Sequence, residues 1–392
     1  MVRVALFAAA TALLSIAAAV PAVRPSDVSS TEASQMFSDT DDYPITNQGN
    51  VITHDPNILE YNDNLYMFKG GVHITIMKAQ NISGPWTEHG TVLDADSVID
   101  KVNRTRPWAP TAIHHNGKFY CFYSVSYTGT RDSSIGIATT DDIEGGAWTD
   151  HGALINTVKG KLSHVFPYTE SNAIDPSFIT DQKTGQPYLV YGSYWHGIWQ
   201  VPLTDDLLSV ADPEKPDAEN LAYLPEPKVK PQEGSFMSYH EPYYYTWFSH
   251  GRCCDYTHNP PKIGQEYEIQ MGRSKDVRGP FVDKSGKKLT EGGGTVVYGS
   301  NHGVVYAPGG PGVLPANGSR PDILYYHYLN TSIGLAFKQA HLGWSYLDYE
   351  DGWPVAKESL EDVKDSASSP RVTYSSNLLI ITFISAFLWI SH

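Results

Sequence analysis

The sequence predicts an all-β fold, a five-bladed β-propeller, on two repeated patterns and the near absence of helical periodicity. The first pattern is a turn, an apolar strand, a second turn and a strand rich in Tyr or Phe, as in HDPNILEYNDNLYMF from His54. The second is a segment built around Gly and Trp, found as SGPWTEHG at Ser83 and GGAWTDHG at Gly145. Short strands separated by Gly, Pro, Asn and Asp turns are typical of all-β proteins.

The first pattern occurs five times, at a spacing of about 60 residues, which is the spacing of a repeat architecture. Five repeats of four short strands each indicate a propeller over residues 43–356, in which the innermost strand of every blade lines a central axis. A sandwich of two sheets is the alternative, but it would not require this period. The five copies begin at Asp55, Ala109, Asp175, Glu233 and His302.

Both ends of the chain read as targeting segments. Residues 1–22 combine Arg3, a long apolar run and small residues near Ala22, which predicts a secretory signal peptide rather than a buried helix. The apolar tail, residues 378–392, is shorter than the roughly 20 residues that span a bilayer. It follows a polar linker, residues 357–377, with small residues around Ser366. This layout predicts a glycosylphosphatidylinositol anchor attached at Ser366, and a docked C-terminal helix is the alternative.

The composition argues against some classes of binding partner. A formal net charge of −15 argues against nucleic acid, whose phosphates attract basic surfaces. We expect a monomer that contacts the membrane through its lipid anchor alone and resides at the cell surface. Three cysteines are too few for a fold built on disulfides, and Cys253 and Cys254 are adjacent, either bonded to each other or reduced. Glycosylation sequons, expected in a secreted protein, begin at Asn81, Asn103, Asn317 and Asn330.

Three of the five repeat starts are acidic: Asp55, Asp175 and Glu233. Carboxylates that face a narrow axis are costly unless they bind a ligand or share protons. Cleavage of a glycosidic bond needs one carboxylic acid to protonate the leaving oxygen and one carboxylate to activate water. We therefore predict Glu233 as the general acid and Asp55 as the general base. Asp175 would orient Glu233 and raise its pKa by charge repulsion.

The segments around these acids resemble the catalytic motifs of the family 43 glycoside hydrolases, and among them the endo-1,5-α-L-arabinanases. The resemblance spans residues 43–356. One departure is Gly234, where the family often has Ala. The matching segments are HDP (54–56), NAIDPS (172–177), EGSF (233–236), GSYWHGI (192–198), SHGRCC (249–254) and GWP (352–354).

The resemblance implies a five-bladed propeller that hydrolyses the α-1,5-linked arabinan side chains of pectin from within the chain, with inversion. It also implies a calcium or other ion at the propeller centre, held by water and one histidine, for which His302 is the candidate. No organic cofactor is expected. The candidate substrate-binding residues are His54, Trp108, Asn172, Ser193, Tyr194 and Trp195. Trp108 and Trp195 could equally be packing residues.

Two alternative functions remain. An exo-acting α-L-arabinofuranosidase or β-xylosidase would share the fold and mechanism, because closure of one end of the cleft decides the mode of attack. A non-catalytic carbohydrate-binding propeller would explain the aromatic residues and the anchor. It would not require three acids at the axis.

Overall fold

The structure is a computed structural model that describes residues 42–226 and 231–364. The predicted signal peptide, the attachment site at Ser366 and the apolar tail lie outside these residues. Within the described ranges, the chain has strands, turns and three short 3-10 helices. None of these described helices has the length and apolar character needed to cross a bilayer.

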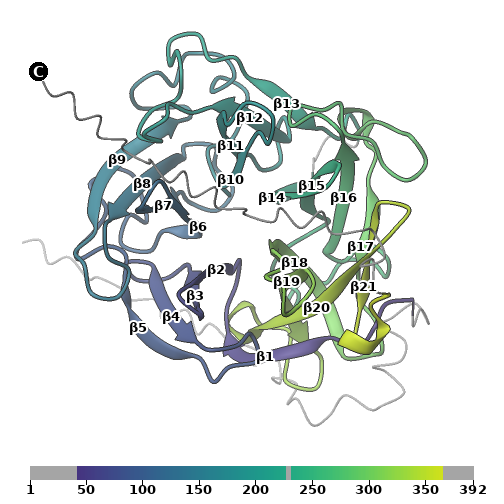
Figure 1. Ribbon diagram of the computed structural model, residues 1–392. Coiled ribbons are helices and arrows are strands. Elements are labelled where there is room, and N and C mark those ends of the chain that lie inside the picture. The colour runs from purple at the N-terminus through teal and green to yellow at the C-terminus, as the bar shows by residue number, and fades with distance from the viewer. Residues whose placement is uncertain (1–41, 227–230, 365–392) are drawn as a thin grey trace, which may run out of the picture.

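Five antiparallel sheets surround a central axis, which confirms the predicted five-bladed β-propeller (Figure 1). Blades one to four each take four consecutive strands, numbered from the axis outwards. Blade one is β2 (Asn57–Tyr61), β3 (Asn64–Lys69), β4 (Thr75–Ala79) and β5 (Thr87–Thr91). Blade two is β6 (Trp108–His115), β7 (Lys118–Val125), β8 (Ser134–Thr140) and β9 (Thr149–Asn156). Blade three is β10 (Ser177–Thr180), β11 (Pro187–Tyr191), β12 (Ile198–Pro202) and β13 (Glu219–Ala222). Blade four is β14 (Gln232–His240), β15 (Tyr243–His250), β16 (Glu268–Ser274) and β17 (Thr295–Tyr298).

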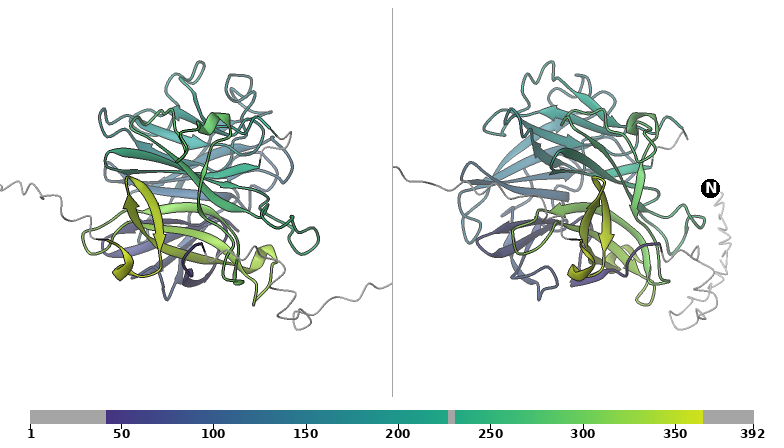
Figure 2. Two further views of the ribbon diagram at one scale, coloured as in Figure 1. Left: turned by 90° about the vertical axis from the view of Figure 1, so that its right-hand side faces the viewer. Right: turned by 45° about the vertical axis from the view of Figure 1, so that its right-hand side comes forward.

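The fifth blade closes the ring by combining the two ends of the domain. Its inner strands are β18 (Val305–Leu314), β19 (Ile323–Asn330) and β20 (Ala340–Glu350), and its outer strand is β1 (Asn47–Ile52). In this pairing Asn47 lies opposite Trp344. A further strand, β21 (Trp353–Lys357), pairs with the other half of β20 and lies at the outside of the blade, yellow in Figure 2. The N-terminal strand therefore ties the first blade to the last.

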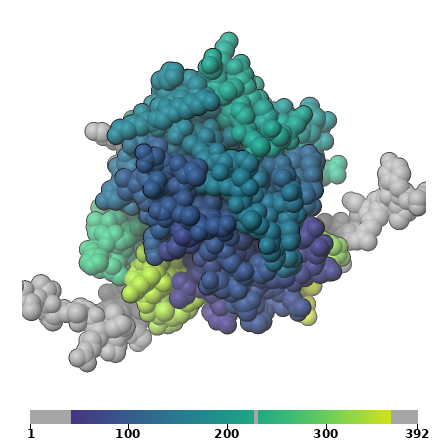
Figure 3. Space-filling model, turned by 90° about the vertical axis from the view of Figure 1, so that its left-hand side faces the viewer, coloured from purple at the N-terminus to yellow at the C-terminus, as the bar shows by residue number. Residues whose placement is uncertain are grey.

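Apolar side chains fill each of the five interfaces between neighbouring blades. Strand β7 shows how the sequence specifies this arrangement, because successive side chains of a strand point to opposite faces. Phe119, Cys121 and Tyr123 pack against blade one, whereas Tyr120 and Phe122 pack against blade three. The blades consequently form a closed outer surface, seen for the early blades, purple to teal, in Figure 3. Packing between blades thus explains most of the aromatic residues in the strands.

Every blade has a residue with left-handed backbone geometry in its innermost strand or just before it. The φ angles are 46° at Asp55, 40° at Ala109, 56° at Asp175, 61° at Gly234 and 57° at Gly310. Four of these residues precede a proline, all except Gly234. Such φ values are uncommon for residues other than glycine, so a turn repeated at the same place in each blade indicates a constraint shared by all five.

This register corrects two of the predicted repeat starts. In blade five the equivalent residue is Gly310, because Gly310-Pro311 repeats the turn of Asp55-Pro56. His302 lies in the turn that precedes β18. In blade four the equivalent residue is Gly234, so that Glu233 stands one position before the turn.

Candidate active site

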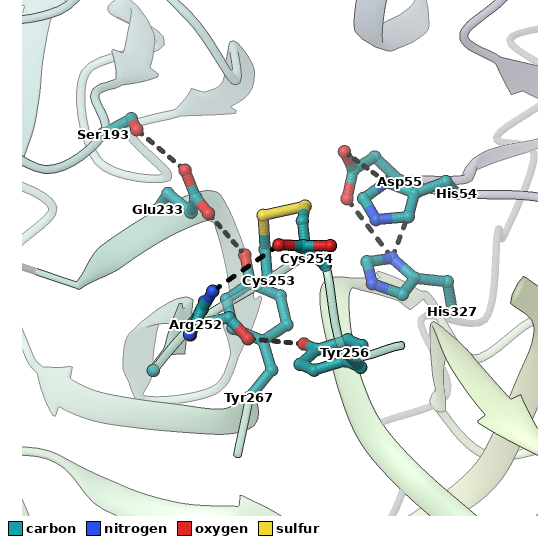
Figure 4. Close-up of a disulfide and its surroundings, with 12 residues drawn as sticks. His54, Asp55, Ser193, Glu233, Arg252, Cys253, Cys254, Tyr256, Tyr267 and His327 are labelled. Atoms are coloured by element: carbon teal, nitrogen blue, oxygen red, sulfur yellow. Dashed lines mark hydrogen bonds and ion pairs between the residues drawn. A yellow bond between two sulfur atoms is a disulfide. The ribbon is translucent and has the colours of Figure 1, made fainter. Parts of the chain in front are cut away.

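The predicted acids converge at the axis, where Asp55 and Asp175 line one pocket and Glu233 directly precedes Gly234, which also lines it. Asp55 enters from blade one, Asp175 from the start of blade three and Glu233 from β14 of blade four (Figure 4 for Asp55 and Glu233). The three carboxyl groups interact electrostatically with one another. Other blades contribute backbone and small side chains, including Ala109 and Gly310, to the same pocket. The converging geometry follows from the propeller, since segments far apart in sequence share one axis.

Two histidines lie beside the carboxyl group of Asp55. The Nδ1 of His54 lies 2.9 Å from Asp55 Oδ2, and the Nδ1 of His327, on β19, lies 3.3 Å from Oδ1. Burial opposes ionisation of Asp55, but the His54 imidazole outweighs it and holds the pKa of Asp55 well below its usual range. The carboxylate still keeps 27% of its surface exposed, so water can reach it. A charged, accessible carboxylate is the form that a general base requires.

Glu233 has the opposite electrostatic environment. Burial raises its pKa, and the charge of Asp55 adds to the rise. Two hydroxyl groups oppose this: Ser193 donates to Oε2 at 2.8 Å and Tyr267 donates to Oε1 at 3.2 Å. The net pKa of Glu233 lies above its ordinary value. Glu233 therefore tends to keep its proton while the two hydroxyls fix the orientation of its carboxyl group, which is what a general acid requires.

Asp175 lies deepest of the three acids, with 8% of its surface exposed. Burial raises its pKa well above the ordinary value, and Glu233 and then Asp55 raise it further. The backbone N–H of Gly234 donates to Asp175 Oδ2 at 2.9 Å and partly offsets this rise. Because Gly234 follows Glu233, this bond joins the predicted modulator to the predicted acid. Three interacting carboxyl groups cannot all ionise easily, so Asp175 and Glu233 compete for a proton.

Hydrogen bonds between neighbouring blades hold three of the residues with left-handed backbone conformation around the axis. Each bond runs from a backbone N–H to a side chain of the preceding blade. Asp175 N donates to Ser124 Oγ at 3.0 Å, and Gly310 N donates to Ser249 Oγ at 2.9 Å. Asp55 N donates to His327 Nδ1 at 3.2 Å. Burial, followed by the neighbouring His54 imidazole, lowers the pKa of His327 to about 4, so its neutral ring can accept this bond at pH 7.

Comparison with known proteins agrees with this geometry. Residues 44–354 match the family described as Glycosyl hydrolases family 43. The chain belongs to this family. A protein of Emericella nidulans described as "Probable arabinan endo-1,5-alpha-L-arabinosidase D" is 54% identical over 348 residues, covering 88% of this chain and 90% of the relative.

Solved structures of arabinanases share the propeller. The Cellvibrio cellulosa alpha-L-arabinanase complexed with arabinohexaose is 27% identical with a TM-score of 0.69, over 81% of this chain and 98% of that one. An exo-1,5-alpha-L-arabinanase from a bovine ruminal metagenomic library is also 27% identical, with a TM-score of 0.68, over 80% of this chain and 100% of the other. One of the structures that share this fold is therefore described as exo-acting.

The structure places the predicted substrate-binding residues in different environments. Asn172 is 2% exposed, and its Oδ1 accepts a hydrogen bond from Ser133 at 2.7 Å, so it supports the loop of this family 43 site and does not face a sugar. Ser193 is buried and acts on Glu233. Trp195 is 38% exposed beside the half-buried Tyr194, on the loop between β11 and β12. Trp195 and Tyr194 thus stay candidates for sugar contact.

Trp108 and His54 complete the set of predicted contacts. Trp108 is half-buried at the start of β6, opposite Ser124 of β7. His54 contacts Asp55, and its ring stacks between His327 and Phe337, with centroid distances of 3.8 and 4.2 Å. His54 is therefore placed to position the carboxylate of Asp55.

The histidine at the axis is His327 and not His302. His302 Nε2 lies 2.6 Å from the backbone oxygen of Tyr43, next to the N-terminal strand. His54, Asp55 and His327 instead form a group whose potential ligand atoms all lie within 4.8 Å of one another, which could hold a metal ion. The prediction failed because the start of the fifth repeat was placed at His302. The repeated residue-before-proline turn at Gly310 was the signal that could have corrected it.

The loop between β15 and β16 carries a disulfide between the adjacent residues Cys253 and Cys254. This settles the two alternatives left by the sequence, and Cys121 is a free, buried cysteine. Figure 4 shows the disulfide in the region between Glu233 and Asp55. Cys253 packs against a small cluster that includes Tyr256 and Tyr267, and Tyr267 is the donor to Glu233. Sequence reasoning missed Tyr267, which no motif had singled out.

The four sequons differ in accessibility. Asn81 and Asn317 are exposed and Asn103 is half-buried, each in a turn or loop. Asn330 is only 6% exposed at the end of β19, and its Oδ1 accepts hydrogen bonds from the backbone and hydroxyl of Ser332. A glycan attached to folded Asn330 would clash with this packing.

Proposed function

We propose that the protein hydrolyses α-1,5-linked L-arabinan from within the chain and inverts the configuration at the anomeric carbon. The observation that carries the proposal is the opposed electrostatics of two carboxyl groups that interact with each other at the axis. The pKa of Asp55 is held low and that of Glu233 is raised. Pairs of titratable groups whose environments push their pKa values apart identify an acid and a base. The family and the 54% identical relative support arabinan as the substrate.

The mechanism follows from these environments. Protonated Glu233, oriented by Ser193 and Tyr267, donates its proton to the glycosidic oxygen as the bond breaks. Asp55 removes a proton from water on the opposite face of the furanose ring, and the water attacks the anomeric carbon. Inversion requires the two carboxyl groups to stand about 6.5 to 9.5 Å apart, so that this water fits between them. Asp175 and Glu233 repel each other when both are ionised, so an ionised Asp175 would favour the acid form of Glu233.

An experiment with debranched linear arabinan separates the candidate functions. Endo-action releases a ladder of oligosaccharides early in the reaction, whereas an exo-acting enzyme releases monomer or one short product from the start. Binding measured by calorimetry without release of reducing sugar would identify a non-catalytic carbohydrate-binding propeller and overturn the proposal. Because an exo-1,5-alpha-L-arabinanase has a similar structure, the fold does not decide between these modes of attack, and the sizes of the products do.

We propose that an ion at the centre binds through the group of His54, Asp55 and His327. Two imidazoles and one carboxylate offer few of the oxygen ligands that calcium prefers, so water would supply most of a calcium shell. A bound cation would add positive charge beside Asp55 and favour its ionised form. Metal analysis of the purified protein and melting curves with and without a chelator test this. Equal melting temperatures and no bound metal would rule the ion out.

We also propose that the protein is secreted and held at the cell surface by a lipid anchor at Ser366. Support comes from the sequence of residues 1–22 and 357–392, and from exposed sequons at Asn81 and Asn317. Release of the protein from cells by a phosphatidylinositol-specific phospholipase would be the expected result. Two results would exclude this anchor. One is retention of the protein on cells after that treatment, and the other is an unchanged surface location of a Ser366 variant.

A further inference from the structure

The described chain ends at the face of the propeller opposite the pocket at the axis. Strand β20 marks the two faces, because it runs from one to the other. At its first residue, the backbone oxygen of Ala340 accepts a hydrogen bond from Thr53 N–H at 2.9 Å, two positions before Asp55. Near its far end, Asp348 Oδ2 accepts a hydrogen bond at 3.4 Å from the backbone N–H of Lys364, the last described residue.

These two contacts lie far apart along one extended strand. Asp348 follows Ala340 by eight residues, which at about 3.4 Å per residue separates them by roughly 27 Å. The ammonium groups of Lys357 and Lys364 lie 3.2 and 3.5 Å from Glu350 Oε1, at the end of β20 next to the turn into β21 (yellow in Figure 2). The chain therefore leaves the domain at the face that carries the β18–β19 and β20–β21 turns, called the exit face; the opposite one is the pocket face.

The two faces differ in what they expose. The turns of the exit face carry the two exposed sequons, Asn81 between β4 and β5 and Asn317 between β18 and β19. Loops of the pocket face carry the exposed apolar side chains of Val98, Val102 and Tyr127. A glycosylated face is hydrated and does not embed in a bilayer, whereas exposed apolar side chains would favour contact of the pocket face with lipid. The position of the tether decides between these two orientations.

Ser366, the proposed attachment residue, follows Lys364 by two positions. Two residues of chain reach about 7 Å, much less than the roughly 27 Å between the faces, so this link is too short to pass around the domain. We infer that the exit face lies against the lipid surface and that the pocket at the axis opens away from the membrane. The inference rests on the proposed function, namely its lipid anchor, and adds which face meets the bilayer. An anchored enzyme in this orientation reaches long arabinan outside the cell without being released.

Resonance energy transfer from the protein to the membrane measures this orientation. The sample is the full anchored chain in phosphatidylcholine vesicles that contain a lipid-linked acceptor dye, with a donor dye on one introduced cysteine. Lys183→Cys and Lys161→Cys are matched, because each replaces an exposed lysine next to blade three. Lys183 lies in the β10–β11 turn of the exit face, and Lys161 lies in the β9–β10 loop of the pocket face. Cys121 is buried and Cys253 is bonded to Cys254, so the introduced thiol is the one that reacts.

We expect strong transfer from the dye at Lys183→Cys and transfer near background from the dye at Lys161→Cys. Equal transfer from both positions, or stronger transfer from Lys161→Cys, overturns the orientation. Treatment of the same vesicles with a phosphatidylinositol-specific phospholipase should release the protein and abolish transfer from both positions. Protein that stays on the vesicles after this treatment overturns the proposed anchor instead, whatever the orientation.

A second measurement compares the anchored enzyme with the enzyme released by the phospholipase, on two substrates. Linear arabinan is a long polymer, whereas a nitrophenyl arabino-oligoside is small enough to enter a gap between the domain and the bilayer. We expect the ratio of the two rates to be the same before and after release. A rate on linear arabinan that rises on release, with no change on the small substrate, would show a pocket turned toward the membrane. Failure of the released enzyme to cut linear arabinan overturns the proposed hydrolysis instead.

Discussion

Removing the hydroxyl of Ser193 should shift the alkaline limb of activity to higher pH. Ser193 is buried and donates to Glu233 Oε2 at 2.8 Å, which stabilises the ionised carboxylate and lowers the pKa of Glu233. Glu233 must be protonated to act, so Ser193→Ala, by raising that pKa, extends the acid form upward in pH. A buried hydrogen bond to a charged group is worth about 1.5–3 kcal/mol, which corresponds to a tenfold or greater change in the ionisation equilibrium.

The assay is kcat on linear arabinan as a function of pH. The matched control is Ser134→Ala, which also removes a buried hydroxyl, bonded to Asn156 at 2.7 Å, but in β8 and away from the carboxylates. The control should leave both limbs in place even if it lowers stability. An alkaline limb of Ser193→Ala that stays put or moves to lower pH would refute the assignment of Glu233 as the acid.

Three further predictions concern the base and the shared proton. His54→Ala removes the imidazole that most lowers the pKa of Asp55, so the acid limb of kcat/KM should move to higher pH; an unmoved limb would contradict Asp55 as the base. Asp175→Asn should abolish activity yet raise the melting temperature at pH 7. The raised folded pKa of Asp175 costs stability above its unfolded pKa, by about 1.4 kcal/mol per pKa unit, and this gain should vanish below about pH 4. A Cβ on Gly310 would lie 2.4 Å from Asp55 Oδ1, so Gly310→Ala should lower kcat by roughly 100-fold or more through displacement of the base; near-normal kcat would show that the carboxylate tolerates the shift.

The sequence predicted those features that repeat locally. The period of about 60 residues is visible because each blade has the same turns and strands. Asp55 and Asp175 follow from their place in that repeat, whereas Glu233 stands one position before it. The closure of blade five by β1 was not predicted, because pairing Asn47 with Trp344 depends on contact across nearly the whole domain. The Cys253–Cys254 pairing also stayed open, since adjacency alone does not decide redox state.

The residues that tune the site were the hardest to predict. His327 lies on a strand of another blade and Tyr267 beside another strand of the same blade, and each contacts an acid more than 30 positions away. Nothing in their local sequence separates them from the many aromatic residues that pack between blades. Asn172 shows the converse: its motif is specific, but the side chain is turned inward to Ser133. Position in a repeat predicts where a residue lies, and its role depends on neighbours that only the fold supplies.

The most direct test of the central claim compares two leaving groups in the Glu233→Gln variant. The account predicts that kcat on linear arabinan falls about 10²–10⁴-fold, because the leaving oxygen no longer receives a proton. On a dinitrophenyl arabino-oligoside, whose phenolate leaves without protonation, most of the rate should remain. An equal loss on both substrates would contradict the role of Glu233 as the acid that works across the pocket from Asp55.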